Sequence, residues 1–298
     1  MQDAVHEKDD IVLMAATGLE GGCVANGSTC GIASGGALGI ALMNDHHLKN
    51  NGSGAEAAVL KSVGNYMDWF HDTYSTTQCR ERNKVDFHSV SGQLKYFFSA
   101  RKIIRCMLMA GGAMNYLTLN HNNRLSDTDI KGHDGCPPSC HCAREVLSLV
   151  RKKTGVGNDR LERLSFVFDG GIGLKGGLCG AVAGSILAIN LIHGFNLRHM
   201  GYTSNVKKFF TGHINLIKKT PGNSIDSFSI GKEMVNQFKK TAGSIECSQI
   251  TGQHFDSIET FNQYIEASET CENLIRLSAD IAARAIENTR GLNQNLYI

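Results

Sequence analysis

Cysteine is the residue type in this chain best suited to chemistry, and its spacing repeats. The 298 residues include 10 cysteines. The sequence C-G-I-A-S-G-G-A-L-G-I-A-L begins at Cys30, and C-G-A-V-A-G-S-I-L-A-I-N-L begins at Cys179. Each copy continues with two further cysteines in the same order, which are Cys79 and Cys106 in the first and Cys247 and Cys271 in the second. Thiolates ligate metals and iron–sulfur clusters and exchange disulfides, so the pattern predicts a duplicated thiol or metal site.

A glycine-rich loop precedes each first cysteine. The sequence G-L-E-G-G spans residues 18–22, and G-L-K-G-G spans residues 173–177. If these two strings correspond, the first copy carries about six extra residues before Cys30, and that insert contains Cys23. We therefore treat Cys23 as a candidate fourth thiol of the first copy.

The positions of these cysteines predict which sulfurs ionise. Cys30 and Cys179 stand where a glycine loop becomes a helix, and Cys140 and Cys142 stand at the start of another predicted helix. A helix N-terminus lowers a thiol pKa, so we expect thiolates at these positions. Four thiolates from separate elements are the usual ligands of [2Fe–2S] and [4Fe–4S] clusters. Zinc accepts the same ligands, but the C-x2-C pairs that are typical of structural zinc sites are absent.

A second motif suggests haem. The segment C-P-P-S-C-H at 136–141 is similar to a haem c attachment site with one extra residue between its cysteines. In that hypothesis Cys136 and Cys140 form the thioethers and His141 is the axial ligand. Alternatively, Cys136 and Cys140 join the metal ligands or are free thiols.

Several functional classes are disfavoured. The formal net charge is +2, without a basic stripe interleaved with aromatic residues, so nucleic acid is not an expected partner. Motifs of serine hydrolases, zinc proteases and P-loop enzymes are absent, and catalytic residues stay unknown. The longest apolar run, 181–192, is too short to span a bilayer. No signal peptide is visible, so we expect a cytoplasmic protein, or a periplasmic or exported one if the N-terminus is processed.

Helices are the elements expected to position the thiols. We predict buried helices at 31–44 and 180–193, amphipathic helices at 55–72 and 226–242, another at 142–153, and a last one from about 257 to 289. Cys106 and Cys271 fall on apolar stripes and are predicted to face inward. Glycines one helical turn apart allow a second backbone or a cofactor to approach, and the candidates for cofactor contact are Gly31, Gly35, Gly177, Gly180 and Gly184.

The second copy resembles a known family. Cys142, C-G-A-x-x-G at 179–184, Cys247 and Cys271 resemble the redox-active C_GCAxxG_C_C family and the related domain of split-Soret cytochromes, which accompanies an iron–sulfur centre. The resemblance implies small helical domains with four ordered cysteines. The first copy matches less completely, because a counterpart of Cys142 would fall before Met1.

Together these patterns predict a mainly α-helical protein of two related bundle-like domains, 1–123 and 130–298, of which the first is incomplete. We expect an iron–sulfur protein for electron transfer or storage, with a redox partner protein and a homo-oligomeric state. The predicted ligands are Cys142, Cys179, Cys247 and Cys271 in the second copy and Cys30, Cys79, Cys106 and Cys23 in the first. Alternatives are a cofactor-free thiol–disulfide oxidoreductase, a c-type cytochrome-like protein, and a degenerate first copy that serves only in docking.

Overall fold

The computed structural model describes residues 2, 7–87, 89–119, 124–131, 140–217 and 226–294. These residues form helices and connecting loops, and two isolated β-bridges, Thr29–Gln78 and Leu178–Glu246, are the extended pairings among them. The predicted mainly α-helical class is confirmed for this part of the chain. No helix among the described residues combines the length and apolar character needed to cross a bilayer.

The helices follow one another in two similar series. The first series and its connection comprise α1 (Asp10–Ala16), η1 (Thr17–Leu19), α2 (Gly31–Met43), α3 (Asp45–Asn50), α4 (Gly52–Tyr74), α5 (Cys79–Asn83), α6 (Val90–Phe97), α7 (Ala100–Leu119) and α8 (Asp127–Lys131). The second series comprises α9 (Cys142–Thr154), α10 (Asp159–Leu164), η3 (Ser165–Phe168), α11 (Gly180–His193), α12 (Tyr202–Ile217), α13 (Ser227–Ala242), α14 (Cys247–Thr251), α15 (Ile258–Ala267) and α16 (Glu269–Gln294).

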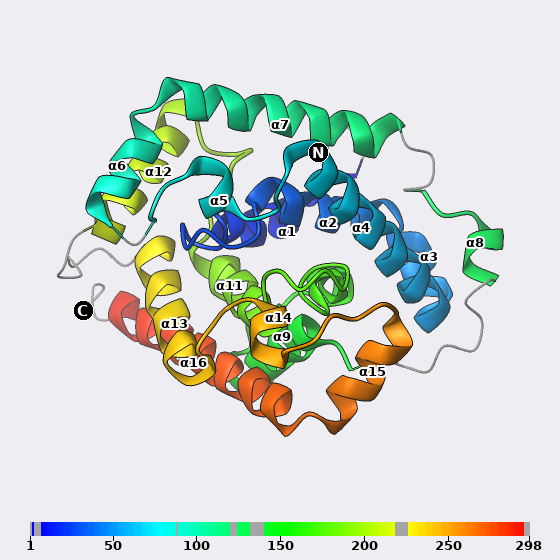
Figure 1. Cartoon of the computed structure of the whole chain (residues 1–298). Coiled ribbons are helices and arrows are strands. Elements are labelled where there is room, and N and C mark those ends of the chain that lie inside the picture. The colour runs from blue at the N-terminus through cyan, green and yellow to red at the C-terminus, as the bar shows by residue number, and fades with distance from the viewer. Residues whose placement is uncertain are drawn as a thin grey trace.

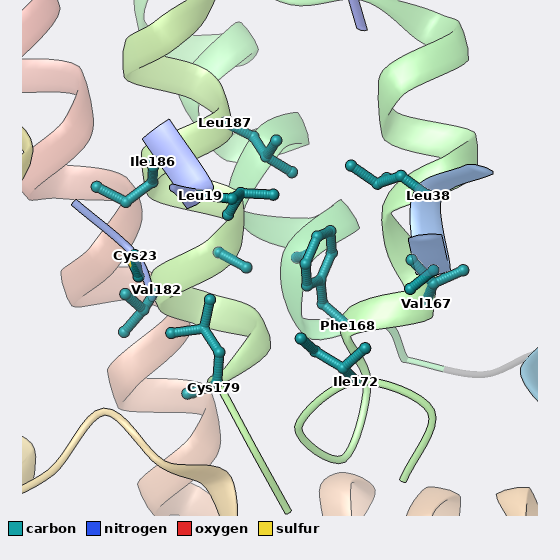
Figure 2. Packing of buried hydrophobic residues seen from close by; sticks show 14 of the residues in the cluster. Leu19, Cys23, Leu38, Val167, Phe168, Ile172, Cys179, Val182, Ile186 and Leu187 are labelled. Atoms are coloured by element: carbon teal, nitrogen blue, oxygen red, sulfur yellow. The ribbon is translucent and has the colours of Figure 1, made fainter. Parts of the chain in front are cut away.

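The two series share one hydrophobic core. Figure 1 shows α7 along one edge of the molecule and α16 along the opposite edge, with α2 and α11 between them. Helix α1 of the first series packs against α11 of the second, and α2 packs against η3. Figure 2 shows part of this core, to which Leu19 and Leu38 of the first series and Phe168 and Ile186 of the second contribute. The domain boundaries at 123 and 130 stay a prediction, but the repeats are not separately packed.

The helices form where caps and apolar residues require them. Asp9 accepts a hydrogen bond from the Val12 amide at the start of α1, and Asn158 accepts one from the Leu161 amide at the start of α10. Such caps satisfy amide groups that have no partner inside the helix. Helices α2 and α11 consist largely of small and apolar residues, most of them buried, so each becomes the central helix of its repeat.

The prediction of one helix from about 257 to 289 is wrong, because this segment forms two helices, α15 and α16. Ser268 has an extended backbone between α15 and α16, and its side-chain oxygen accepts a hydrogen bond from the Cys271 amide. This serine competes with helix continuation by satisfying an amide of the next helix. The break places Cys271 in the first turn of α16, where it is half-buried beside Leu274 and Ile275.

Candidate functional site

The loops before Cys30 and Cys179 have the same backbone path. The Val24 amide donates to the Gly18 carbonyl, and the Gly173 amide donates to the Val167 carbonyl. The same offset of 149 residues, the difference between Cys30 and Cys179, relates most of the other loop bonds, as in Gly27–Gly21 and Gly176–Gly170. The left-handed backbone angles recur with this offset as well. Glu20-Gly21-Gly22 therefore corresponds to Asp169-Gly170-Gly171.

This register corrects the expected match of residues 18–22 with 173–177. The first repeat has no insert before Cys30, and Cys23 takes the position of Ile172. The error arose because the second loop holds two Gly-Gly pairs, at 170–171 and 176–177, and sequence alone does not tell which corresponds to 21–22.

Backbone hydrogen bonds also hold the next cysteine of each repeat beside its loop. The Cys79 amide donates to the Ser28 carbonyl at 2.8 Å, and the Cys247 amide donates to the Gly177 carbonyl at 2.7 Å. The Cys179 amide in turn donates to Ile245, the residue two before Cys247. These bonds hold the first turns of α11 and α14 side by side. The loop therefore positions two of the predicted ligands, Cys179 and Cys247, at the same cavity.

The four predicted cysteines of the second repeat line one cavity. The cavity has a volume of about 20 Å³, and its other lining residues are mostly apolar, such as Ile250, Phe261 and Tyr264. Its four thiols come from four elements, which are Cys142 of α9, Cys179 before α11, Cys247 of α14 and Cys271 of α16. No imidazole or carboxylate lines it among the described residues. Among the described residues, the potential metal ligands at this cavity are therefore the four thiols and the hydroxyl groups of Thr251 and Tyr264.

Burial raises the pKa of these thiols, whereas their places at helix starts were expected to lower it. Burial raises the pKa of Cys179 to about 11, although the backbone N–H groups of Ala181 and Val182 oppose it. Burial and the neighbouring Asp169, Cys179 and Cys271 raise the pKa of Cys142 well above its ordinary value. Burial also raises the pKa of Cys247, with Cys179 and Cys271 adding to it. Four thiolates cannot coexist in this apolar cavity unless cations enter with them.

The distance between ligand sulfurs distinguishes a site for a single metal ion from a site for a polynuclear cluster. Within the described ranges, no three Cys, His, Asp or Glu side chains lie as close together as a single metal ion requires. A zinc ion bonds its sulfurs at about 2.3 Å, so they lie only about 3.8 Å from one another. A polynuclear cluster separates its ligand sulfurs more widely, because irons and sulfides lie between them. A cavity of about 20 Å³ holds roughly one water-sized body, so a cluster would require its lining side chains to move outward.

A buried polar network holds Cys142 in place. The Cys142 amide donates to Asp169 Oδ1 at 3.1 Å, and Asp169 Oδ2 contacts His141 Nδ1 at 2.5 Å. His141 Nε2 contacts Glu56 of α4 at 3.0 Å, and Arg144 donates to the same carboxylate. Burial alone would lower the pKa of His141, but Asp169 and Glu56 raise it to about 9. The network thus joins the first repeat to the cysteine cavity of the second.

The three residues predicted to bind haem, Cys136, Cys140 and His141, do not form a haem site among the described residues. Both ring nitrogens of His141 contact carboxylates, so neither offers an axial bond to a haem in this arrangement. Cys140 is exposed and does not line the cysteine cavity, while Cys136 lies outside the described residues.

In the first repeat, Cys30 and Cys106 are near enough to Cys79 to act on its thiol electrostatically. Burial raises the pKa of all three thiols. The Asn83 side chain donates to Cys79 Sγ at 3.3 Å, and Tyr96 hydrogen-bonds to Cys106. Cys23 is buried elsewhere, where the charges acting on it belong to Glu246, Lys239 and Glu20. The structure thus gives the first repeat three thiols without a fourth beside them among the described residues.

Two of the five candidate glycines serve helix packing. A Cβ on Gly180 would meet Cys142 Cβ at 2.8 Å, and one on Gly184 would meet the Ala143 carbonyl at 2.7 Å. Gly177 faces Thr29, and Gly31 faces the Leu19 carbonyl. A Cβ on Gly35 would meet no described atom within 4 Å. Gly180 and Gly184 therefore allow the close approach of α9 rather than of a cofactor, although Gly180 also lines the cysteine cavity.

Comparison with known proteins agrees with this duplication. The family model described as "Putative redox-active protein (C_GCAxxG_C_C)" matches residues 1–118 and again residues 140–285. The chain belongs to this family. The predicted resemblance and the predicted duplication are both confirmed by the two matches. The first match contains Cys30, Cys79 and Cys106, and the second contains the four cysteines of the cavity. No curated protein and no solved structure matches the chain.

Sequence reasoning missed the polar residues around the thiols. Glu56, Asp169 and Arg82 were not among the candidates, although Asp169 stands directly before the glycine loop. An acidic residue before Gly-Gly in both repeats, Glu20 and Asp169, is the signal that would have indicated a shared role in the loop. Nothing in the sequence placed Glu56 near His141, because they lie 85 residues apart.

Proposed function

We propose that the second repeat is a redox centre in which Cys142, Cys179, Cys247 and Cys271 ligate an iron–sulfur cluster for electron transfer or storage. Membership in a redox-active family supports the general role. The observation that carries the specific proposal is the convergence of four thiols from four elements on one cavity that no described imidazole or carboxylate lines.

The electrostatics of the cavity support a cationic occupant. Ionising several buried thiols in one apolar space is costly, and the raised pKa values express that cost. Iron cations compensate the thiolate charge, and the backbone N–H groups of Ala181 and Val182 near Cys179 stabilise the charge that remains. When bound, a cluster supplies one-electron chemistry at a potential that such hydrogen bonds tune.

The protein residues around the site have separable roles in this proposal. Asp169 positions Cys142 by accepting its amide hydrogen bond, and His141 orients Asp169 from the other side. Ile250 and Phe261 exclude water from the sulfurs. Cys271 is half-buried and the other three cysteines are buried, so a redox partner protein would exchange electrons with a bound cluster from the side of Cys271.

An anaerobic preparation of the full chain tests the proposal. We expect broad absorption near about 400 nm that bleaches with dithionite, together with iron and acid-labile sulfide in the same sample. A colourless protein that takes up neither iron nor sulfide during anaerobic reconstitution would refute the cluster. The same cysteines would then be assigned to thiol–disulfide exchange.

A further inference from the structure

The exposed apolar side chains of this protein are concentrated on α6 and α7. Among the described residues, nine large apolar side chains between positions 90 and 119 are exposed, and these nine define what we call the α6–α7 surface. They are Val90, Leu94, Phe98, Ile103, Ile104, Met107, Leu108, Met114 and Leu119. Scattered exposed apolar residues are ordinary, but a concentration of this kind marks an interaction surface.

Helix α7 is apolar on two opposite faces. Its buried face consists of Met109, Ala113 and Leu117. The opposite face, an arc of roughly 140° at about 100° per residue, carries the exposed Ile103, Ile104, Met107, Leu108 and Met114. A helix that is apolar all round is normally covered on every side. Figure 1 shows α7 along the outer edge of the molecule, so the cover for this outward face comes from outside the described residues.

The charge around this face has one sign. Residues 87–126 contain no Asp or Glu, and their cationic side chains are Lys95, Arg101, Lys102, Arg105 and Arg124. Lys95, Arg101 and Arg105 are exposed, and no carboxylate in the described part of the chain forms an ion pair with them. Cations without counter-charges beside an apolar face favour a negatively charged partner.

The corner between α6 and α7 combines both properties. Phe98, which ends α6, is 81% exposed and is the most exposed large apolar side chain of the described residues. Lys95 precedes it by three residues, and Arg101 and Lys102 follow it in the first turn of α7. An apolar side chain that inserts among lipid headgroups, next to cations that attract those headgroups, is a physical basis for binding an anionic bilayer.

The charges also distinguish between occupants of this surface. Two copies joined through it would bring cations together with no carboxylate from residues 87–126 on either side, and like charges at an interface oppose association. An anionic bilayer compensates the cations instead. The boundary between its headgroups and acyl chains also accepts a convex helix face along its whole length, which for the 20 residues of α7 is about 30 Å.

We propose that the α6–α7 surface docks the protein on a bilayer that contains anionic lipid. Phe98 and the outward face of α7 lie at the boundary between headgroups and acyl chains, and the cations contact the headgroups. Figure 1 shows α16 along the edge opposite α7, so docking leaves that edge, with Cys271 in the first turn of α16, accessible to a redox partner.

The experiment mixes the full-length protein with sucrose-loaded vesicles and measures the fraction that sediments with them. Vesicles of phosphatidylcholine with about 30% phosphatidylglycerol are compared with phosphatidylcholine alone, at about 0.1 M and about 0.5 M salt. We expect at least about tenfold tighter binding to the anionic vesicles at low salt, and loss of most of this preference at high salt, because several cations contact the headgroups. The readout does not depend on whether the second repeat binds a cluster.

Matched variants separate the apolar and the electrostatic contributions. Leu108→Gln removes an apolar side chain from the surface and should weaken vesicle binding by about fivefold or more, whereas Leu197→Gln, at an exposed leucine elsewhere, should leave it unchanged. Arg101→Gln should weaken binding to the anionic vesicles by about threefold or more, whereas Arg284→Gln, at an exposed arginine of α16, should not. Circular dichroism checks that each variant is folded.

Three kinds of result would overturn the proposal. The first is equal binding to both kinds of vesicle, binding to neither, or binding that Leu108→Gln does not weaken. The second is a lipid-free dimer in sedimentation velocity that Leu108→Gln dissociates, which would assign the surface to a second copy. The third is retention on immobilised poly-glutamate without vesicle binding, which would assign it to an acidic protein.

Discussion

One glycine position has opposite surroundings in the two repeats, and this permits a sensitive test of the structure. Gly184 of α11 and Gly35 of α2 are equivalent under the 149-residue offset. A Cβ at 184 would meet the Ala143 carbonyl oxygen at 2.7 Å and Ala143 Cα at 3.0 Å, and both atoms belong to the backbone of α9. A Cβ at 35 would meet no described atom within 4 Å.

The expected free energies follow from these distances. Alanine favours a helix over glycine by about 0.5–1 kcal/mol, and this gain applies to both positions. At 184 the added methyl group forces α9 outward, and overpacking of this kind costs about 1–3 kcal/mol. We therefore expect Gly184→Ala to lower the free energy of unfolding by about 1–2 kcal/mol and Gly35→Ala to raise it by about 0.5–1 kcal/mol.

Urea unfolding followed by circular dichroism measures both variants against the wild type. In thermal unfolding, a change of 1 kcal/mol corresponds to about 2–4 °C for a protein of roughly 200 residues, and a somewhat smaller shift is expected here. The reasoning is refuted if both substitutions change stability in the same direction by similar amounts. If Gly184→Ala kept its stability but lost bound metal, Gly184 would instead be assigned to contact with the cofactor.

Three further predictions concern the supports of the site. Ser268→Ala removes the cap at the Cys271 amide and should lower the free energy of unfolding by about 1 kcal/mol, whereas Ser268→Gly should cost only a few tenths, as urea titration of both variants will show. Between pH 6.5 and 8 the free energy of unfolding of the wild type should fall as the pH rises. The pKa of His141 in the folded protein is about 9, and Glu20 raises the pKa of His213 although burial opposes it. Both exceed the value in the unfolded chain, so the folded protein keeps protons that the unfolded chain releases. Each histidine contributes at most about 1.4 kcal/mol per pH unit, and Glu20→Gln should reduce the slope; a flat profile over this range would contradict the assignment. Removal of bound iron by an anaerobic chelator should lower the melting temperature of the wild type, since a cofactor that binds only the folded state stabilises it, and an unchanged melting temperature in a verified iron-free sample would count against a ligand role.

Sequence patterns predicted the central helices and the cysteine sets because those features are local or repeated. The glycine- and alanine-rich runs after Cys30 and Cys179 are buried helices within one residue of their predicted bounds. The four thiols of the second repeat came from the order of the motif, and the structure gathers them around one cavity. Cys106 and Cys271, which helical periodicity predicted to face inward, are both half-buried, and Cys271 lines the cysteine cavity.

The parts that sequence did not predict depend on contacts between distant residues. Whether a thiol at a helix start ionises is decided by its burial, and that burial comes from helices packed against it rather than from its neighbours in the chain. The loop register required the backbone hydrogen bonds, because two Gly-Gly pairs compete in the second repeat. Arg82 resembles an ordinary surface arginine in sequence, and only the structure shows that it is buried and contacts Tyr74 and Met109.

The central claim is that the redox cofactor belongs to the second repeat and is held by its four cysteines. Cys179 and Cys30 occupy equivalent positions, since each precedes the central helix of its repeat and accepts backbone N–H groups at its sulfur. Serine substitutions at these two positions therefore perturb the same local structure, and only one of them removes a proposed ligand.

The most direct measurement is the iron and acid-labile sulfide content of Cys179→Ser and Cys30→Ser, prepared anaerobically beside the wild type. We expect Cys179→Ser to lose most of its iron and sulfide and Cys30→Ser to keep the wild-type content. Equal loss in both variants, or loss in Cys30→Ser alone, would contradict the assignment of the cofactor to Cys142, Cys179, Cys247 and Cys271.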